Sequence, residues 1–184
     1  MLLAKATLHV FGTAGGVHST DLALRRSCYP PTTDGNVCAY GGCSWIMEAV
    51  NTVRMVKDFI MNHVSMVADD TLDLKVLGLN ETWHGYDVVL MQKLTLMKDE
   101  LQLMVINEKW SSSLDDLDRE KARIVKKKLL NDIFWGKIQY ILSITEPIYN
   151  VMKIVNSGKR CLHLMHEMWG SMIMKVKEAI YYHE

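Results

Sequence analysis

The sequence predicts a mainly α-helical fold, and two observations support this prediction. From residue 44 onward, apolar residues recur every three to four positions, which is the spacing of one face of an α-helix. Two of the three prolines and a glycine pair lie between residues 29 and 43, which predicts a loop there. With 184 residues, of which 49% are hydrophobic, the chain has the size of one domain with its own core.

Only two short segments are expected to form strands. Leu8–Phe11 is a β-like run followed by Gly12, and Leu74–Leu79 reads either as a short strand or as a buried linker. One or two strands cannot make a self-sufficient sheet. The strands are therefore expected to be isolated elements near the N-terminus of a helical protein.

The first two long helices are predicted from their stripes. Ser44 is a suitable N-cap, because its hydroxyl can accept a hydrogen bond from a free backbone N–H group of the first turn. The stripe that follows it is Trp45, Ala49, Val53, Val56 and Ile60. The stripe of the second helix is Leu90, Leu94, Met97, Leu101 and Met104.

Three further helices are predicted in the remainder of the chain. Ser113 and Asp116 have the spacing of a capping box and open a charged helix toward Leu130. The next stripe runs through residues 134–155 and contains Pro147, which predicts a kink or a break. Glycine in Asn156–Gly158 favours the end of that helix. A last stripe occupies residues 162–180.

The charges argue against a strong attraction to polyanions. The 21 basic residues balance the 21 acidic ones, so no global field favours nucleic acid or an anionic membrane. The basic cluster Lys126, Lys127 and Lys128 follows acidic residues in the same predicted helix, which favours a solvated face. No apolar run suits a signal peptide or a membrane span, so we expect a soluble protein of the nucleus or cytoplasm.

Three patterns resemble binding sites, and each has a simpler structural interpretation. The four cysteines contain no C-x-x-C pair, which favours reduced thiols over a zinc site. His163, His166 and Glu167 fall within one helical turn without an evident further ligand. The pair Gly15–Gly16 precedes a helix start but lacks the lysine of a phosphate loop. We therefore expect no metal and no cofactor.

Five segments, taken in order, resemble plant transposases of the hAT superfamily. They are "CSWIMEAV" from Cys43, "IMNH" from Ile60, "LQLMVINEKWSS" from Leu101, "FWGKIQYILSITEPIYNVMKIV" from Phe134 and "LHLMHEMWGSMIMKVKEAIYYHE" from Leu162. The similarity runs from about His9 to the C-terminus. It implies a helical insertion domain of an RNase H-like transposase, with one or two short orphan β-strands near the N-terminus. In that reading residues 1–184 form a single partial domain, in which residues 1–28 are a remnant strand and helix and residues 44–184 are the insertion.

Two motifs of the family are altered here. "VFGTAGGVHSTDLALRR" resembles the family's end-of-strand motif, with His18 at the motif histidine and Gly15 at the motif cysteine, which implies a structural remnant. At Thr82-Trp83-His84 the family commonly has threonine, arginine and an aromatic residue. Trp83 cannot supply the arginine's charge or its fork of donors. The resemblance leaves Trp83, His84 and Lys126–Lys128 as the candidate DNA contacts.

The resemblance also implies that the protein is not an enzyme. The family's metal-binding carboxylates lie before and after the matched span, and Asp21, Asp69 and Asp70 do not stand at their positions. The expectation is a truncated, catalytically inactive transposase-derived protein that retains weak binding to DNA, to proteins or to other transposase-like chains. The alternatives are a helical protein-interaction module without DNA contact, and a metal-dependent nuclease completed by another chain.

Overall fold

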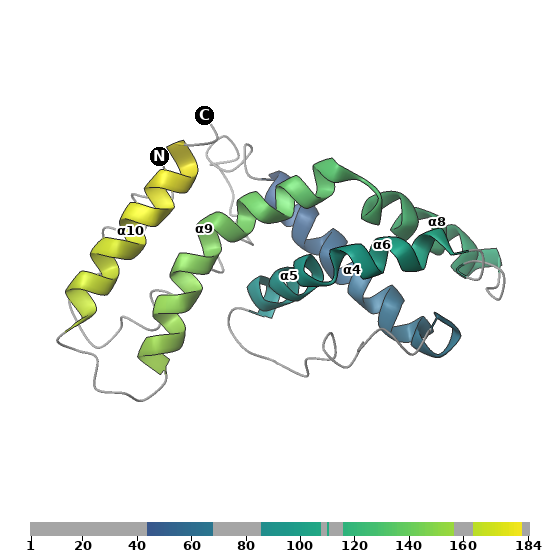
Figure 1. Ribbon diagram of the computed structural model, residues 1–184, viewed down its shortest axis with the longest axis horizontal. Coiled ribbons are helices and arrows are strands. Elements are labelled where there is room, and N and C mark those ends of the chain that lie inside the picture. The colour runs from purple at the N-terminus through teal and green to yellow at the C-terminus, as the bar shows by residue number, and fades with distance from the viewer. Residues whose placement is uncertain (1–43, 68–85, 108–109, 111–115, 157–163, 182–184) are drawn as a thin grey trace, which may run out of the picture.

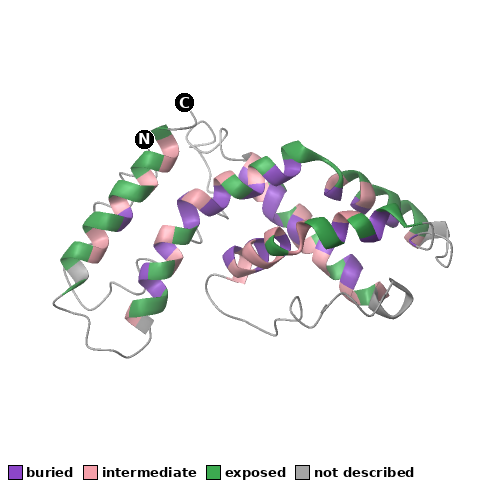
Figure 2. Cartoon of the chain, viewed as in Figure 1, coloured by how far each residue is buried: buried purple, intermediate pink, exposed green. Residues whose placement is uncertain are grey.

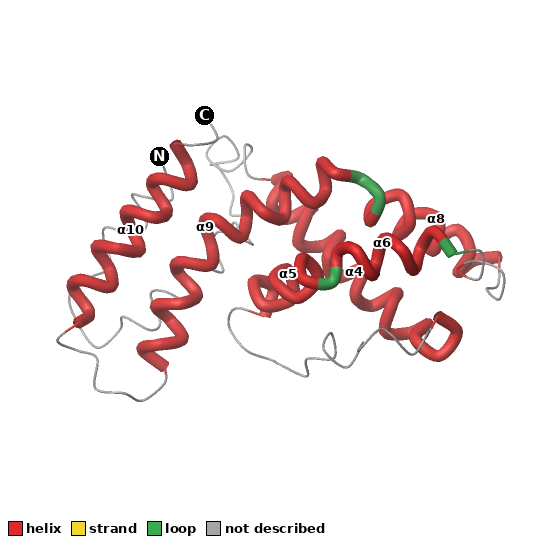
Figure 3. Tube along the Cα trace, viewed as in Figure 1, coloured by secondary structure: helices red, strands yellow, loops and turns green. Residues whose placement is uncertain are grey.

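The computed structural model describes residues 44–67, 86–107, 110, 116–156 and 164–181. These residues are almost entirely helical and contain no strand (Figure 3), which confirms the mainly α prediction for this part of the chain. The predicted strands Leu8–Phe11 and Leu74–Leu79 lie outside the described ranges. Among the helices of these ranges, none combines the length and the apolar character that crossing a membrane requires.

The described helices form a bundle with a two-helix arm (Figure 1). α4, α5, α6 and α8 pack together with the first half of α9, and α10 lies beside the second half of α9. α9 thus belongs to both parts, and we call α10 with the second half of α9 the arm. The bounds are α4 Ser44–Val67, α5 Tyr86–Leu96, α6 Lys98–Ile106, α8 Asp116–Leu129, α9 Asp132–Asn156 and α10 Met165–Tyr181.

The predicted stripes supply much of the core of the bundle, and buried residues outside them, such as Met91 and Leu129, complete it. Buried residues recur along the inward faces of its helices (Figure 2), because side chains three or four positions apart share one helix face. Removing each large apolar side chain from water contributes about 1.5–3 kcal/mol to the free energy of folding. The largest fully buried side chains are Ile60, Leu90, Met91, Leu94, Leu101, Leu129, Ile138 and Ile148.

The helix predicted around residues 90–104 is two helices, α5 and α6. The interruption is at Met97, whose φ of −96° and ψ of 14° depart from helical values. Met97 is still hydrogen-bonded to both helices: its N–H group donates to the Lys93 carbonyl at 3.1 Å, and its carbonyl accepts from Leu101 N at 2.9 Å. The apolar stripe from Leu90 to Met104 therefore still faces the core, although the helix is interrupted.

The junction of α6, α8 and α9 is organised by one carbonyl group, that of Leu129. A helix leaves its last carbonyls without intrahelical donors, and Leu129 is the last residue of α8. Its oxygen accepts hydrogen bonds from Gln102 Nε2 of α6 at 2.9 Å and from Trp135 Nε1 of α9 at 2.7 Å. Asn131 Oδ1 then accepts from Ile133 N at 2.9 Å, which caps the start of α9.

A kink or a break is predicted at Pro147, and α9 is a continuous, curved helix, so the break does not occur (Figure 1). Pro147 has no N–H group to donate to the carbonyl four residues earlier. Close to it, the Thr145 hydroxyl donates to the Ile141 carbonyl at 2.7 Å and the Ser143 hydroxyl donates to the Tyr140 carbonyl at 2.8 Å. A missing donor and hydroxyl bonds of this kind both bend helices. α9 ends at Asn156, as its sequence predicts.

The arm is less buried than the bundle. Of the apolar stripe predicted for the last helix, Met172 is buried, whereas Trp169, Val176 and Ile180 are only partly covered. α10 packs chiefly against α9 and has no second layer of described helices over it. Its position consequently depends on the direction that α9 takes from the bundle.

We predict that two leucines of α6 differ sharply in their contribution to stability. Leu101 is fully buried and Leu103 is 71% exposed, so only Leu101→Ala leaves a cavity. Urea denaturation is expected to show a loss of about 2–5 kcal/mol for Leu101→Ala and a change within about 0.5 kcal/mol for Leu103→Ala. Equal losses from the two substitutions would contradict the placement of α6.

Candidate functional site

The predicted basic cluster lies in the last turn of α8. Ala122, Val125 and Leu129 are buried against the bundle and fix the rotation of this helix about its axis. Consecutive residues of an α-helix point about 100° apart, so Lys126, Lys127 and Lys128 spread around the helix. Lys127 is exposed, while the lysines on either side of it are partly covered. The run therefore does not form one compact basic patch.

Ion pairs reduce the positive charge of α8 further. Among the described residues, Lys126 and Lys127 form no ion pair, but three other basic side chains of α8 each meet a carboxylate. Such exposed pairs contribute only about 0–1 kcal/mol to stability, although each one offsets a charge. The three pairs are Lys121–Asp118 at 3.2 Å, Arg123–Glu120 at 2.8 Å and Lys128–Glu48 of α4 at 3.9 Å.

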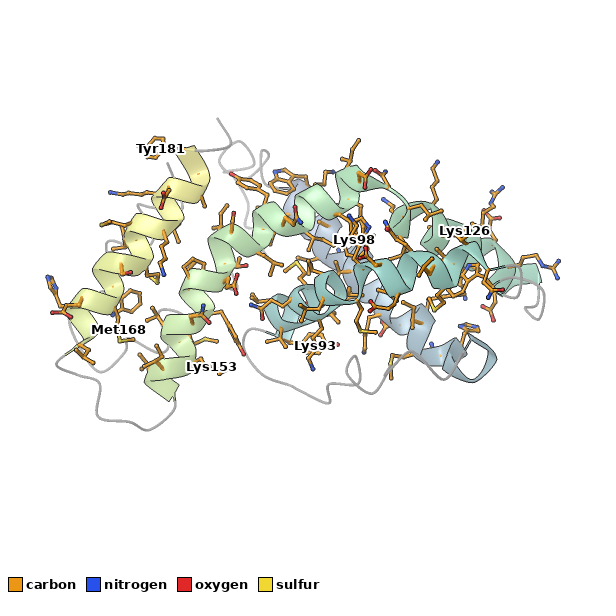
Figure 4. The ribbon with its side chains drawn as sticks, in the orientation of Figure 1. Lys93, Lys98, Lys126, Lys153, Met168 and Tyr181 are labelled. Carbon is orange, nitrogen blue, oxygen red and sulfur yellow. The ribbon has the colours of Figure 1, made fainter. Side chains whose placement is uncertain are left out.

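Other lysines are scattered over the molecule. Figure 4 shows Lys93 on α5, Lys126 on α8 and Lys153 on α9, well apart from one another. Lys98 of α6 lies over the Trp135 ring, 5.6 Å from its centroid, and 3.9 Å from the Asp132 carboxylate. Within the described ranges, the lysines therefore do not line a continuous track that a nucleic-acid backbone would follow.

Several predicted site residues lie outside the described ranges: Gly15, His18, Trp83, His84, His163 and the four cysteines. Their roles stay predictions. His166 and Glu167, the described members of the helical metal-site pattern, are exposed in the first turn of α10. Within the described ranges, no group of three or more histidine, cysteine, aspartate or glutamate side chains is placed to hold a metal ion.

The structure adds a feature that the sequence did not indicate, a groove of about 650 Å³ between α4 and α8. Its lining combines apolar side chains with polar and charged ones. Its two walls, α4 and α8, are far apart in the sequence, so no local motif indicates the groove. The lining residues are Asn51, Arg54, Met55, Asp58, Phe59, Asn62 and His63 from α4, with Asp118, Lys121, Ile124 and Val125 from α8.

At one end of the groove, His63 of α4 meets Asp118 of α8. His63 Nε2 is 3.3 Å from Asp118 Oδ2, and Lys121 Nζ is 3.2 Å from the other oxygen, Oδ1. Hydrogen bonds from His63 and then from Lys121 hold the pKa of the Asp118 carboxyl below its ordinary value. Asp118 therefore stays ionised at neutral pH, and its contribution to stability is lost only as the pH falls through that lowered pKa.

Near the other end, Arg54 fastens α4 to α5. Arg54 Nε is 2.7 Å from Asp87 Oδ1, and its Nη2 is 2.9 Å from Asp87 Oδ2. This two-bond geometry is the strong form of an arginine–carboxylate pair, and it holds Arg54 in one orientation. One wall of the groove is thus tied to a third helix.

No known protein-family model matches this chain, and neither a curated protein nor a solved structure shows significant similarity to it. Over the described residues, the structure is a mainly α-helical bundle with an arm. The groove and the basic end of α8 are its two candidate sites.

Proposed function

We propose that this chain is a non-catalytic, transposase-derived helical module that contacts nucleic acid only weakly and without sequence preference. The order of five segments that resemble hAT transposases supports the derivation. The arrangement of charge on α8 supports the weak contact, because the lysine run spreads around the helix and Lys128 is paired with Glu48. Lys126 and Lys127 are left as the cations of this run that are available to phosphate groups.

Two available lysines set the expected strength of binding. Non-specific affinity comes from phosphate charges that the protein neutralises, and each contact adds about 0.9 to the slope of log affinity against log salt. Sequence preference requires side chains that reach base edges in a groove of the nucleic acid. A pair of lysines on one helix end can hold a phosphate backbone but cannot read bases.

The absence of catalysis in this proposal rests on the resemblance, whose metal-binding carboxylates do not fall on this chain. The carboxylates around the groove support it, since each is already engaged with a cation. Asp58 pairs with Lys57 at 3.1 Å, Asp87 pairs with Arg54, and Asp118 pairs with His63 and Lys121. Carboxylates used in this way are poor candidates for holding two divalent metal ions.

A second candidate function is a helical protein-interaction module without DNA contact. Leu103 is 71% exposed and Ile106 is 57% exposed, and because they are three positions apart they lie on the same face of α6. Exposed apolar residues that gather on one face are typical of protein–protein contact. This candidate is favoured if DNA binding is absent even at low salt.

We predict weak, salt-sensitive DNA binding that depends on the end of α8. A fluorescence-anisotropy titration is expected to give dissociation constants of about 10⁻⁴–10⁻⁶ M or weaker at physiological salt, with a log–log salt slope near −2. Replacing Lys126 and Lys127 by glutamine is expected to abolish the binding. The matched control replaces the two exposed lysines Lys175 and Lys177 of α10 by glutamine and is expected to leave the binding nearly unchanged.

Two results of this titration would contradict the proposal. Nanomolar affinity for one sequence at physiological salt would indicate a DNA-recognition protein. Equal losses in the two lysine variants would mean that only total charge matters, and that the end of α8 is not the contact.

We predict no magnesium- or manganese-dependent cleavage of DNA that carries transposon ends. The resemblance does not place the family's metal-binding carboxylates at positions of this sequence, so no metal-assisted cleavage is expected. A gel-based cleavage assay with each metal checks this. Cleavage that is abolished by substituting Asp21, Asp69 or Asp70 would locate an active site at these residues and contradict the prediction.

A further inference from the structure

His63 is held between two hydrogen-bond acceptors. Its Nδ1 is 2.8 Å from the Phe59 carbonyl oxygen on α4, and its Nε2 is 3.3 Å from Asp118 Oδ2 on α8. A backbone carbonyl and an ionised carboxylate can only accept hydrogen bonds. A neutral imidazole carries one N–H group, whereas an imidazolium carries two. Both contacts can therefore be hydrogen bonds only when His63 is protonated.

We propose that His63 and Asp118 form a proton-operated clasp between α4 and α8. The clasp is closed while the imidazole carries two protons, and it loses one hydrogen bond and the ionic attraction when the imidazole becomes neutral. This inference is independent of the proposed function, because it uses only the contact between the two helices.

The surroundings of His63 keep its ring in the geometry that the clasp requires. The ring stacks on Phe59, with centroids 4.3 Å apart and an angle of 24° between the planes. Phe59 in turn packs against Trp110 at 5.6 Å. The His63 side chain is 14% exposed, so the pair is less screened by water than an ordinary surface ion pair.

The charged groups around the pair do not compete with it. From α8, Lys121 bonds the second oxygen of Asp118, so each cation has an oxygen of its own. From α4, Asp58 lines the same groove but is paired with Lys57. Arg54, also in the groove, is engaged by Asp87 of α5. Among the described residues that line the groove, His63 therefore has Asp118 as its ionic partner.

The positions in the helices favour the same charges. His63 lies about one turn before Val67, the last residue of α4, and Asp118 lies in the first turn of α8. The helix dipole favours a cation near a C-terminal end and an anion near an N-terminal end. The protonated pair therefore gains from both helices, and the neutral imidazole forfeits that gain.

The clasp has a defined pH window. The contact is complete while the imidazole carries both protons, and it is lost as rising pH removes one of them. The contact is also lost at low pH, because protonation of the Asp118 carboxylate removes the acceptor. Because the pair lies in the wall of the groove, the proton state sets how firmly α8 is held against α4 at that end.

The test compares urea unfolding of the full 184-residue chain at pH 6 and pH 8, at constant ionic strength, for the parent and two variants. His63→Gln keeps a side chain that can donate to Asp118 but cannot titrate. His166→Gln removes the exposed histidine of α10 and is the matched control. The folding constant of the parent relative to His63→Gln is expected to be about twofold or more larger at pH 6 than at pH 8. His166→Gln should follow the parent.

A second measurement uses the parent and Asp118→Asn, so that it does not depend on the stability of His63→Gln. In NMR spectra, the amide signals of Asp118–Lys121 are expected to follow the same pH transition as the His63 ring. In Asp118→Asn they should no longer follow it. The clasp is overturned if these α8 signals ignore the His63 transition in the parent, or if His63→Gln keeps the full pH dependence of stability.

Discussion

The carbonyl group of Leu129 is the acceptor on which the arrangement of the helices depends. It is the last carbonyl of α8, and it receives the side-chain N–H groups of Gln102 from α6 and Trp135 from α9. A buried carbonyl without a donor costs about 1–3 kcal/mol, so the two donors hold three helices at one point. Because α9 starts there and carries the arm, the junction also sets where α10 lies.

The rotation of α8, which its buried residues fix, has consequences for both candidate sites. With Ala122, Val125 and Leu129 turned inward, Lys127 points to solvent and Lys128 approaches Glu48. The same rotation brings Asp118, two turns before Val125, to His63 on α4. The limited positive charge of the α8 end and the proton-operated clasp thus follow from one packing arrangement. Neither depends on a ligand.

The helices and their inward faces could be predicted from the sequence, because burial of a stripe every three to four residues leaves a local signal. The interruption at Met97 could not, since the apolar pattern continues through it. Pro147 predicts a kink or a break from its missing N–H group, but the sequence alone does not decide between them, and α9 curves without breaking. His63 and Asp118 are 55 positions apart, and a pair at that separation leaves no pattern in one sequence. Trp83, His84, Gly15 and His18 lie outside the described residues, so their predicted roles stand as predictions.

The central claim is that two side chains share one carbonyl at the α6–α8–α9 junction. The most direct measurement is a double-mutant cycle on the free energy of unfolding with Trp135→Phe, Gln102→Leu and the two together. Each single substitution leaves one donor on the Leu129 carbonyl, whereas the double substitution leaves it unsatisfied. The double variant is therefore expected to lose about 1 kcal/mol or more beyond the sum of the single losses. Strictly additive losses would contradict the shared carbonyl as the element that holds the three helices together.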